Sequence, residues 1–175
     1  VHMKCWSSEL SRECTATEDE HSARTAAAHL GIPFYVWNFV SEYKRRVVDY
    51  MLAGYEQGFT PNPDIMCNKE IKFGLFYERA MKLGADFVAT GHYARIREGR
   101  ILEGRDKEKD QSYFLSFIKP EVLDRVLFPV GEYTKLQVRE LARKFGLPNA
   151  ERKDSQGICF VGEVAIGDFL RQYIK

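Results

Sequence analysis

The chain has 175 residues, 45% of them hydrophobic, which is enough to bury a substantial core in one domain or in two small units. Its 26 basic and 25 acidic residues give a net charge of +1, so any RNA site must be a local patch. No apolar stretch approaches the roughly 20 residues of a membrane span, and no signal peptide is visible. We therefore expect a cytoplasmic protein, or an organellar one in a eukaryote, with no membrane partner.

The first half of the chain alternates strand-like and helix-like patterns. The expected elements are a strand end over 1–6, a helix over 18–30, a buried strand over 34–39, a helix over 42–55, a loop over 58–64, a helix over 65–83 and a strand over 87–90. Gly31 follows the first helix and suits a helix C terminus. One face of the helix over 42–55 should carry Tyr43, Val47, Tyr50 and Met51. The rhythm predicts the α/β class.

The second half mixes hairpin and helix signals. Segments 93–96 and 101–103 flank a turn centred on Glu98-Gly99, which suits a β-hairpin. A helix should start at Thr134, because Gln137 three residues later completes a capping box. Its apolar stripe is expected to hold Val138, Leu141, Ala142 and Phe145. A last helical stretch covers 164–173.

Two of the four cysteines stand in distinctive loops. Cys67 follows a Pro-x-Pro-Asp turn that would leave Asp64 about one helical turn from the thiol, and Cys159 follows a Ser-Gln-Gly turn. Cys5 and Cys14 are expected to be inert. Because the four include no Cys-x-x-Cys pair, a zinc site is disfavoured and no metal ligands are assigned.

These loops belong to a larger set of sequence segments that covers essentially the whole chain. The set consists of Met3-Lys4-Cys5-Trp6, Leu30-Gly31-Ile32-Pro33-Phe34, residues 60–68, Ile71-Lys72-Phe73-Gly74, Ala89-Thr90-Gly91-His92-Tyr93, residues 109–115, Leu127-Phe128-Pro129-Val130-Gly131 and residues 154–160. It resembles the tRNA-specific 2-thiouridylase family, whose members replace the C2 oxygen of a wobble uridine with sulfur. The resemblance implies a Rossmann-like, doubly wound parallel sheet of the adenine nucleotide α-hydrolase (PP-loop) type.

One family motif is missing from the sequence. Members open with a Ser-Gly-Gly-x-Asp-Ser loop that holds the ATP pyrophosphate, and no such run occurs here. The chain therefore resembles a fragment that lacks both this N-terminal loop and the family's C-terminal β-rich region. We expect a catalytic domain over 1–162, the start of a following region over 163–175, and little or no activity from the fragment alone.

The resemblance also implies a chemistry. ATP, with Mg²⁺, would adenylate the uracil O2, and Cys159 would carry sulfur as a persulfide received from a sulfur-relay or cysteine desulfurase protein. Cys67 would be the nucleophile that either releases hydrosulfide from this persulfide or resolves a Cys67–Cys159 disulfide. Both schemes need thiolates near neutral pH, below the usual thiol pKa of about 8.5.

Asn62, Pro63 and Asp64 are the residues that the resemblance places at the target base of the tRNA. Asp64 would act as general acid/base or position the base, and Asn62 offers an amide that can read the polar edge of uracil. The alternative from the sequence alone is an ordinary turn that caps the next helix. A negative Asp64 would raise the pKa of Cys67, so its role must extend beyond activating that thiol.

Further residues are assigned by the same resemblance. Met3 and Gly91 lie at expected strand ends and would contact ATP, whereas His92 would contact tRNA. Lys109, Asp110 and Gln111 would also contact tRNA, in a segment where residues 95–109 hold six basic and four acidic side chains. Without the resemblance, such a charged loop is read as solvated surface and Met3 as core.

Two other functions remain open. One is a non-catalytic tRNA-binding remnant whose cysteines are incidental. The other is a different PP-loop ATP pyrophosphatase that acts on a small acid or amide and has no use for two thiols.

Overall fold

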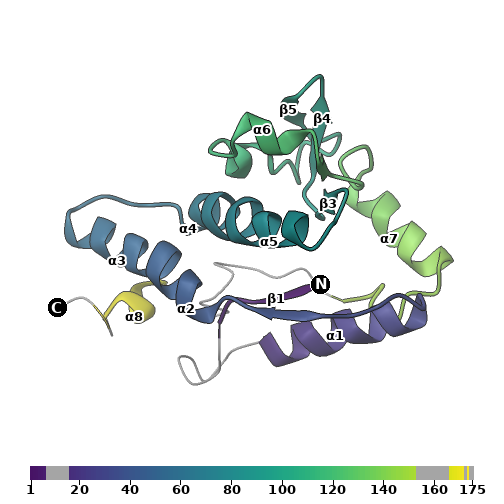
Figure 1. Ribbon diagram of the computed structural model, residues 1–175, viewed down its shortest axis with the longest axis horizontal. Coiled ribbons are helices and arrows are strands. Elements are labelled where there is room, and N and C mark those ends of the chain that lie inside the picture. Colours follow the sequence, from purple (N-terminus) through teal and green to yellow (C-terminus); the bar gives the residue numbers. More distant parts are fainter. Residues whose placement is uncertain (7–15, 153–165, 172, 174–175) are drawn as a thin grey trace. The chain divides into compact units, whose positions relative to one another are not determined.

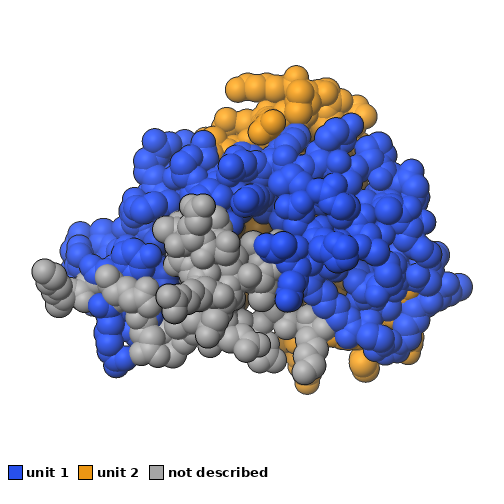
Figure 2. Space-filling view, turned by 90° about the horizontal axis from the view of Figure 1, so that it is seen from below, with its two compact units in different colours: residues 1–64, 143–175 blue, residues 65–142 orange. Residues whose placement is uncertain are grey.

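A computed structural model describes residues 1–6, 16–152, 166–171 and 173 (Figure 1). They fall into two compact units (Figure 2). Unit 1 comprises residues 1–64 and 143–175, and unit 2 comprises residues 65–142. No helix in the described ranges is both long and apolar enough to cross a membrane.

Unit 1 contains a short parallel strand pair. Strand β1 (His2–Lys4) pairs with β2 (Val36–Asn38), and helix α1 (Ala16–His29) lies between them in the sequence. Gly31 has a φ of 65° just after α1, as expected for a glycine that ends a helix. The prediction of a buried strand over 34–39 is wrong in its burial, because Tyr35 is 61% exposed and Val36 is 37% exposed. Two paired strands cannot cover both of their own faces.

The next helix contains a π-helical segment. It consists of α2 (Val40–Tyr43), the π-helix η1 (Lys44–Val48) and α3 (Asp49–Glu56). Its buried face holds Tyr43, Val47, Val48 and Met51, whereas Tyr50 is 44% exposed. The prediction that Tyr50 belongs to this face is wrong because a π-helix bonds residue i to i+5, which changes the residues that share a face.

A second composite helix carries Cys67. It consists of α4 (Pro63–Met66), the π-helix η2 (Cys67–Phe76) and α5 (Tyr77–Lys82). It starts two residues before the predicted position, because proline suits the first turn of a helix. A Cβ at Gly74 would lie 2.9 Å from the Lys69 carbonyl oxygen, so the π-helix needs glycine there. The boundary between the two units falls inside α4.

Unit 2 contains the expected hairpin and a parallel strand pair. Strands β4 (Ala94–Arg97) and β5 (Arg100–Glu103) are antiparallel, with Glu98 and Gly99 both at positive φ in the turn. Strand β3 (Val88–Ala89) pairs in parallel with β6 (Val126–Leu127). The sequence analysis did not predict β6, which has only two residues.

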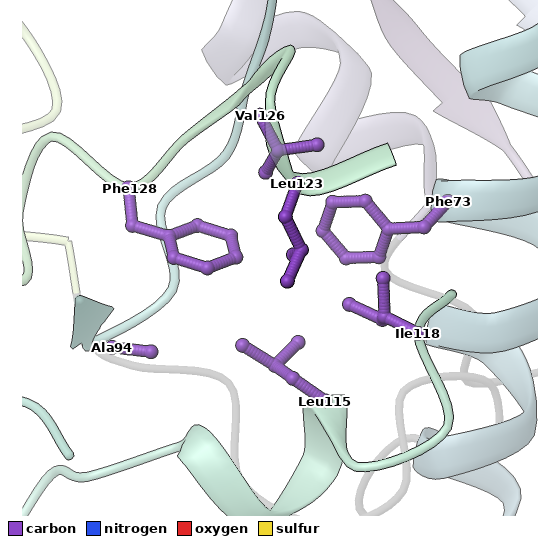
Figure 3. Close-up of a cluster of buried hydrophobic side chains, with 7 residues drawn as sticks. All are labelled: Phe73, Ala94, Leu115, Ile118, Leu123, Val126 and Phe128. Atoms are coloured by element: carbon purple, nitrogen blue, oxygen red, sulfur yellow. The ribbon is translucent and has the colours of Figure 1, made fainter. Parts of the chain in front are cut away.

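Seven buried side chains form the core of unit 2 (Figure 3). They are Phe73, Ala94, Leu115, Ile118, Leu123, Val126 and Phe128. These residues come from η2, β4, the 3₁₀ helix η3 (Ser112–Leu115), helix α6 (Pro120–Leu123), β6 and the loops between them. The backbone approaches closely beside this core, since a Cβ on Gly131 would overlap the Ala94 carbonyl oxygen. One core therefore ties the π-helix η2 to the hairpin.

Helix α7 (Lys135–Lys144) follows, and α8 (Ile166–Arg171) is the last described helix. The capping box of α7 is confirmed, with Gln137 N–H donating to Thr134 Oγ1 at 3.3 Å and Thr134 N–H donating to Gln137 Oε1 at 2.9 Å. Its predicted stripe is not a buried face, because Phe145 is 60% exposed and α7 buries no side chain fully.

The α/β class is confirmed, but the full doubly wound sheet is not seen. The described strands form three separate two-stranded sheets, two parallel and one antiparallel. The strands are two to four residues long, so each sheet has few ladder hydrogen bonds. The domain division at 162 remains a prediction.

Candidate functional site

Cys67 is the first residue of the π-helix η2 in unit 2. It is 6% exposed. Asp64 stands three residues earlier in α4 and belongs to unit 1. Cys159, the predicted persulfide carrier, lies outside the described residues, as does Cys14. The predicted pairing of Cys67 with Cys159 therefore remains a prediction.

The turn before Cys67 is organised by Asn62. Its Oδ1 accepts a hydrogen bond from the Asp64 backbone N–H at 3.0 Å, which is the way a side chain caps a helix start. Pro63 is buried, whereas Asp64 is half-buried. The Asn62 side chain thus caps the start of this helix. The predicted roles of these three residues toward the target base remain predictions.

Asn68, directly after Cys67, is a residue that the sequence analysis missed. It is 2% exposed, and its Nδ2 donates to the Phe114 backbone carbonyl at 3.2 Å. Its Oδ1 is buried and accepts no hydrogen bond from any described residue. A buried acceptor without a donor costs about 1–3 kcal/mol of stability. The only signal in the sequence was its position beside Cys67.

His92 is buried in the core region of unit 2. It is 7% exposed, and the centroid of its ring lies 5.8 Å from the ring centroid of Phe73 and 5.7 Å from that of Phe128. Its Nδ1 is 2.7 Å from Thr90 Oγ1, within hydrogen-bond distance. Burial, with a smaller contribution from the nearby charge of Lys72, lowers the His92 pKa from 6.5 to about 3. The imidazole is therefore neutral at physiological pH. Its predicted contact with tRNA remains a prediction.

Asp110 organises the loop after the hairpin. Its Oδ1 accepts from the Gly104 N–H at 2.6 Å and from the Ser112 N–H at 3.4 Å, and its Oδ2 accepts from Ser112 Oγ at 2.8 Å. Burial opposes ionisation, but these hydrogen bonds and the charge of Lys107 together lower the Asp110 pKa below its usual 3.8. The ionised carboxylate therefore holds both ends of the loop.

Gln111 binds the same loop to the hairpin. Its Oε1 accepts from the Tyr93 N–H at 3.0 Å, and its own backbone N–H donates to the Tyr93 carbonyl at 3.0 Å. Lys109 is exposed between these anchored residues and the hairpin. Of the predicted tRNA-contacting triplet, two side chains shape the loop, and the lysine is the one that faces solvent.

The charges of the hairpin are unevenly distributed. Arg95 Nη1 lies 3.6 Å from a carboxylate oxygen of Glu132, and Lys107 contacts Glu103. Arg97 and Arg100 are directly opposite each other in the register and are both exposed. Like charges that face each other across strands are unfavourable unless an anion lies nearby. The end of the hairpin therefore carries two exposed arginines that face each other, with Glu98 in the turn between them.

The two residues predicted to contact ATP belong to different units. Met3 lies in β1 and is half-buried, and Gly91 is an exposed residue after β3. A Cβ on Gly91 would meet no atom within 4 Å, so this glycine lies open at the surface. Among the residues described, no cluster of three His, Cys, Asp or Glu could hold a metal ion.

Comparison with known proteins defines the class to which this chain belongs. Residues 1–163 match the family described as "tRNA methyl transferase HUP domain". The chain therefore belongs to this family.

Among its relatives, it is 49% identical over 180 residues to the tRNA-specific 2-thiouridylase MnmA of Akkermansia muciniphila, covering 99% of this chain and 50% of that protein. It is similar to proteins of the same name from Levilactobacillus brevis, at 49% identity, and Streptococcus pyogenes serotype M49, at 51%. These alignments cover 99% of this chain and 48% of each relative. The resemblance noted in the sequence is thus confirmed. The chain spans about half the length of the curated relatives that it matches.

Proposed function

We propose that this chain is part of an enzyme that converts uridine in tRNA to 2-thiouridine at the wobble position, with the use of ATP. The observation that supports this most strongly is the identity of about 50% to proteins named tRNA-specific 2-thiouridylase over 99% of the chain. The exposed Arg97, Arg100 and Lys109 suit a local contact with RNA phosphates.

The first proposed step activates the base. The uracil O2 attacks the α-phosphorus of ATP and pyrophosphate leaves, so that the oxygen becomes part of a good leaving group. Met3 and Gly91 are the proposed ATP contacts, and Mg²⁺ would be bound mainly through the phosphates. Asp64, with Asn62 and Pro63, is the proposed group that orients the base or moves its proton.

The second proposed step delivers sulfur. Cys159 carries a persulfide received from a sulfur-relay or cysteine desulfurase protein. In one route, the Cys67 thiolate attacks the Cys159 sulfur, a disulfide forms, and the released hydrosulfide attacks C2 and displaces AMP. In the other route, the terminal persulfide sulfur attacks C2 directly and displaces AMP, and Cys67 then attacks the Cys159 sulfur, which breaks the S–S bond, forms the Cys67–Cys159 disulfide and frees the thiolated base. Both routes leave a Cys67–Cys159 disulfide that a thiol reductant must reduce.

The test of this proposal is an assay by omission. The assay uses a longer polypeptide, in which this chain is extended with the parts of a relative that it does not cover. This polypeptide is incubated with tRNA, ATP, Mg²⁺ and a persulfide donor, and the nucleosides are analysed by mass spectrometry. We expect 2-thiouridine only when ATP and the donor are both present, whereas pyrophosphate release should require ATP and tRNA but not the donor. Product without ATP, or none in the complete mixture, would contradict the proposal. The 175-residue chain, assayed beside it, tests the expectation that this piece alone is inactive.

The other two functions give different results. A tRNA-binding remnant would bind tRNA without ATP and would keep full affinity after both Cys67 and Cys159 are replaced by serine, with no thiolated product from any variant. A PP-loop enzyme for a small substrate would release pyrophosphate without tRNA and would carry no persulfide on Cys159. Trapping that persulfide by alkylation and mass spectrometry therefore excludes the second of these. A cytoplasmic location remains a prediction.

A further inference from the structure

Two unfavourable features coincide where the helix of Cys67 enters unit 2. The first is the π-helix η2, which runs for ten residues, whereas π-helical geometry is usually confined to single turns that are common at functional sites. The second is the buried Oδ1 of Asn68, which no described residue satisfies. Native proteins keep few such atoms, and each calls for an explanation.

The other end of the Asn68 side chain makes a specific contact. Its Nδ2 donates to the carbonyl of Phe114, a residue of η3 that is 46 positions away in the sequence. A backbone carbonyl cannot be removed by substitution, so the asparagine amide alone decides whether this link exists. The link joins the second residue of η2 to the helix that directly follows Lys109, Asp110 and Gln111.

The segment that accepts this hydrogen bond is itself fixed. The Asp110 carboxylate accepts hydrogen bonds from Gly104 and Ser112. Gln111 accepts one from the Tyr93 N–H through its side chain and donates one to the Tyr93 carbonyl from its backbone. Leu115, the last residue of η3, is fully buried in the core of unit 2. Asn68 therefore anchors the start of η2 to a rigid part of the same unit.

We propose that Asn68 is a positioning residue for Cys67. Its amide holds the first turn of η2 on η3, so the neighbouring thiol is kept buried and in a fixed direction until it reacts. The inference that this matters for sulfur transfer rests on the proposed function, whereas the inference that Asn68 controls the accessibility of Cys67 does not.

The first experiment measures the accessibility of Cys67 in this chain without tRNA or ATP. The wild type, Asn68→Leu and Asn68→Ala are treated with iodoacetamide, and the alkylation of the Cys67 and Cys5 peptides is followed by mass spectrometry. We expect alkylation of Cys67 to rise by about fivefold or more in both variants while that of Cys5, in unit 1, stays constant, because local opening frees one segment and not the fold.

Asn149→Leu is the matched control, since it removes another side-chain amide hydrogen bond, to Ser22 Oγ in unit 1. It should leave the alkylation of Cys67 at the wild-type rate. If Cys67 in the Asn68 variants reacts at the wild-type rate, or if Cys67 and Cys5 rise together, the positioning role is overturned. Asn68→Ala keeps the test decisive if the larger leucine prevents folding.

The second experiment separates this inference from the proposed function. In the longer polypeptide, Asn68→Leu should lower kcat for thiolation by about tenfold or more, as a misplaced reactive group does. KM for tRNA should stay within about twofold of the wild type. A wild-type kcat in the variant would overturn the link to sulfur transfer. If the wild-type polypeptide makes no 2-thiouridine, the proposed function fails and the alkylation result still decides the role of Asn68.

Discussion

The two units differ in how their residues are held. In unit 2, seven buried side chains pack together, and Asn68, Asp110 and Gln111 each bond to backbone groups of another segment. In unit 1, large apolar side chains near the strand pair, such as Leu30 and Tyr35, are more than half exposed at 53% and 61%. Unit 1 also has a buried helix face, formed by Tyr43, Val47, Val48 and Met51. The difference therefore concerns the strand pair of unit 1, where Tyr35 and Val36 are exposed, and the candidate residues of unit 2, which are held by contacts within that unit.

This difference concerns how firmly each unit holds its candidate reactive groups before a substrate binds. Reactive groups act efficiently when supporting contacts lock their positions in advance. The start of η2, the buried His92 and the loop over 109–111 all receive such support inside unit 2. Four predictions test this contrast between the units, in order of decreasing effect.

Truncation of the buried Leu115 in unit 2 and of the exposed Leu30 near the strand pair of unit 1 should show the largest difference. Leu115 is fully buried, so Leu115→Ala should lower the free energy of unfolding of unit 2 by about 2–5 kcal/mol. Leu30 is 53% exposed, so the same change there should stay within about 0.5 kcal/mol. Hydrogen exchange along a denaturant series, read separately for each unit, measures both. Equal losses at the two positions would remove the contrast.

Arg97 and Arg100, at the end of the hairpin, should contribute to tRNA binding by unit 2. In a plot of log affinity against log salt concentration, replacing Arg97 and Arg100 together by alanine should make the slope less steep by about 2, because two phosphates would no longer be neutralised. Lys44→Ala, in unit 1, removes a lysine that pairs with Asp49 at 2.8 Å and serves as the control. Filter binding across a salt series measures the slope. An unchanged slope in the double variant would show that the hairpin does not meet RNA.

The loop held by Asp110 should loosen in acid. Because the pKa of Asp110 is lower in the folded state than its usual 3.8, its contribution to stability is present above that value and is lost as pH falls through the folded pKa. Exchange of the Gly104 amide should accelerate over this range. In Asp110→Asn, which has no charge to lose, this acid-dependent step should be absent. Its persistence there would assign the step to another group.

His92 should give the smallest response, namely no titration near neutrality. With its pKa lowered to about 3, the ring stays neutral in the fold, and the stability it contributes is full above pH 6.5 and declines as pH falls toward 3. Proton NMR should show a constant His92 ring shift from about pH 5 to 8, the range in which an unperturbed histidine titrates. A midpoint for His92 near its ordinary value of 6.5 would mean that it is not buried in solution.

Local patterns in the sequence predicted local structure well. The helices over 18–30 and 65–83, the hairpin and the capping box at Thr134 are all present, because each depends on residues close together in the chain. Tyr50 was misplaced because sequence periodicity assumes an α-helix and does not reveal a π-helical segment. Strand β6 was missed because two residues show no periodicity.

The candidate site was predicted in part. Cys67 could be found from its loop and its family resemblance. Asn68 could not, because its importance depends on burial and on a partner 46 positions away. The family resemblance also gave no sign that Asp110 and Gln111 bond to their own unit, since a residue type does not state which partner it will meet. Distant pairing of this kind becomes visible only in the folded chain.

The participation of Cys67 in sulfur transfer to tRNA is the core of the proposed function. It is tested by single-turnover formation of 2-thiouridine by the longer polypeptide as wild type, Cys67→Ser and Cys5→Ser, the last serving as a matched control at a second thiol. We expect no product from Cys67→Ser and wild-type product from Cys5→Ser, because serine cannot replace a thiolate in either route. Wild-type product from Cys67→Ser would contradict the proposed role of this cysteine.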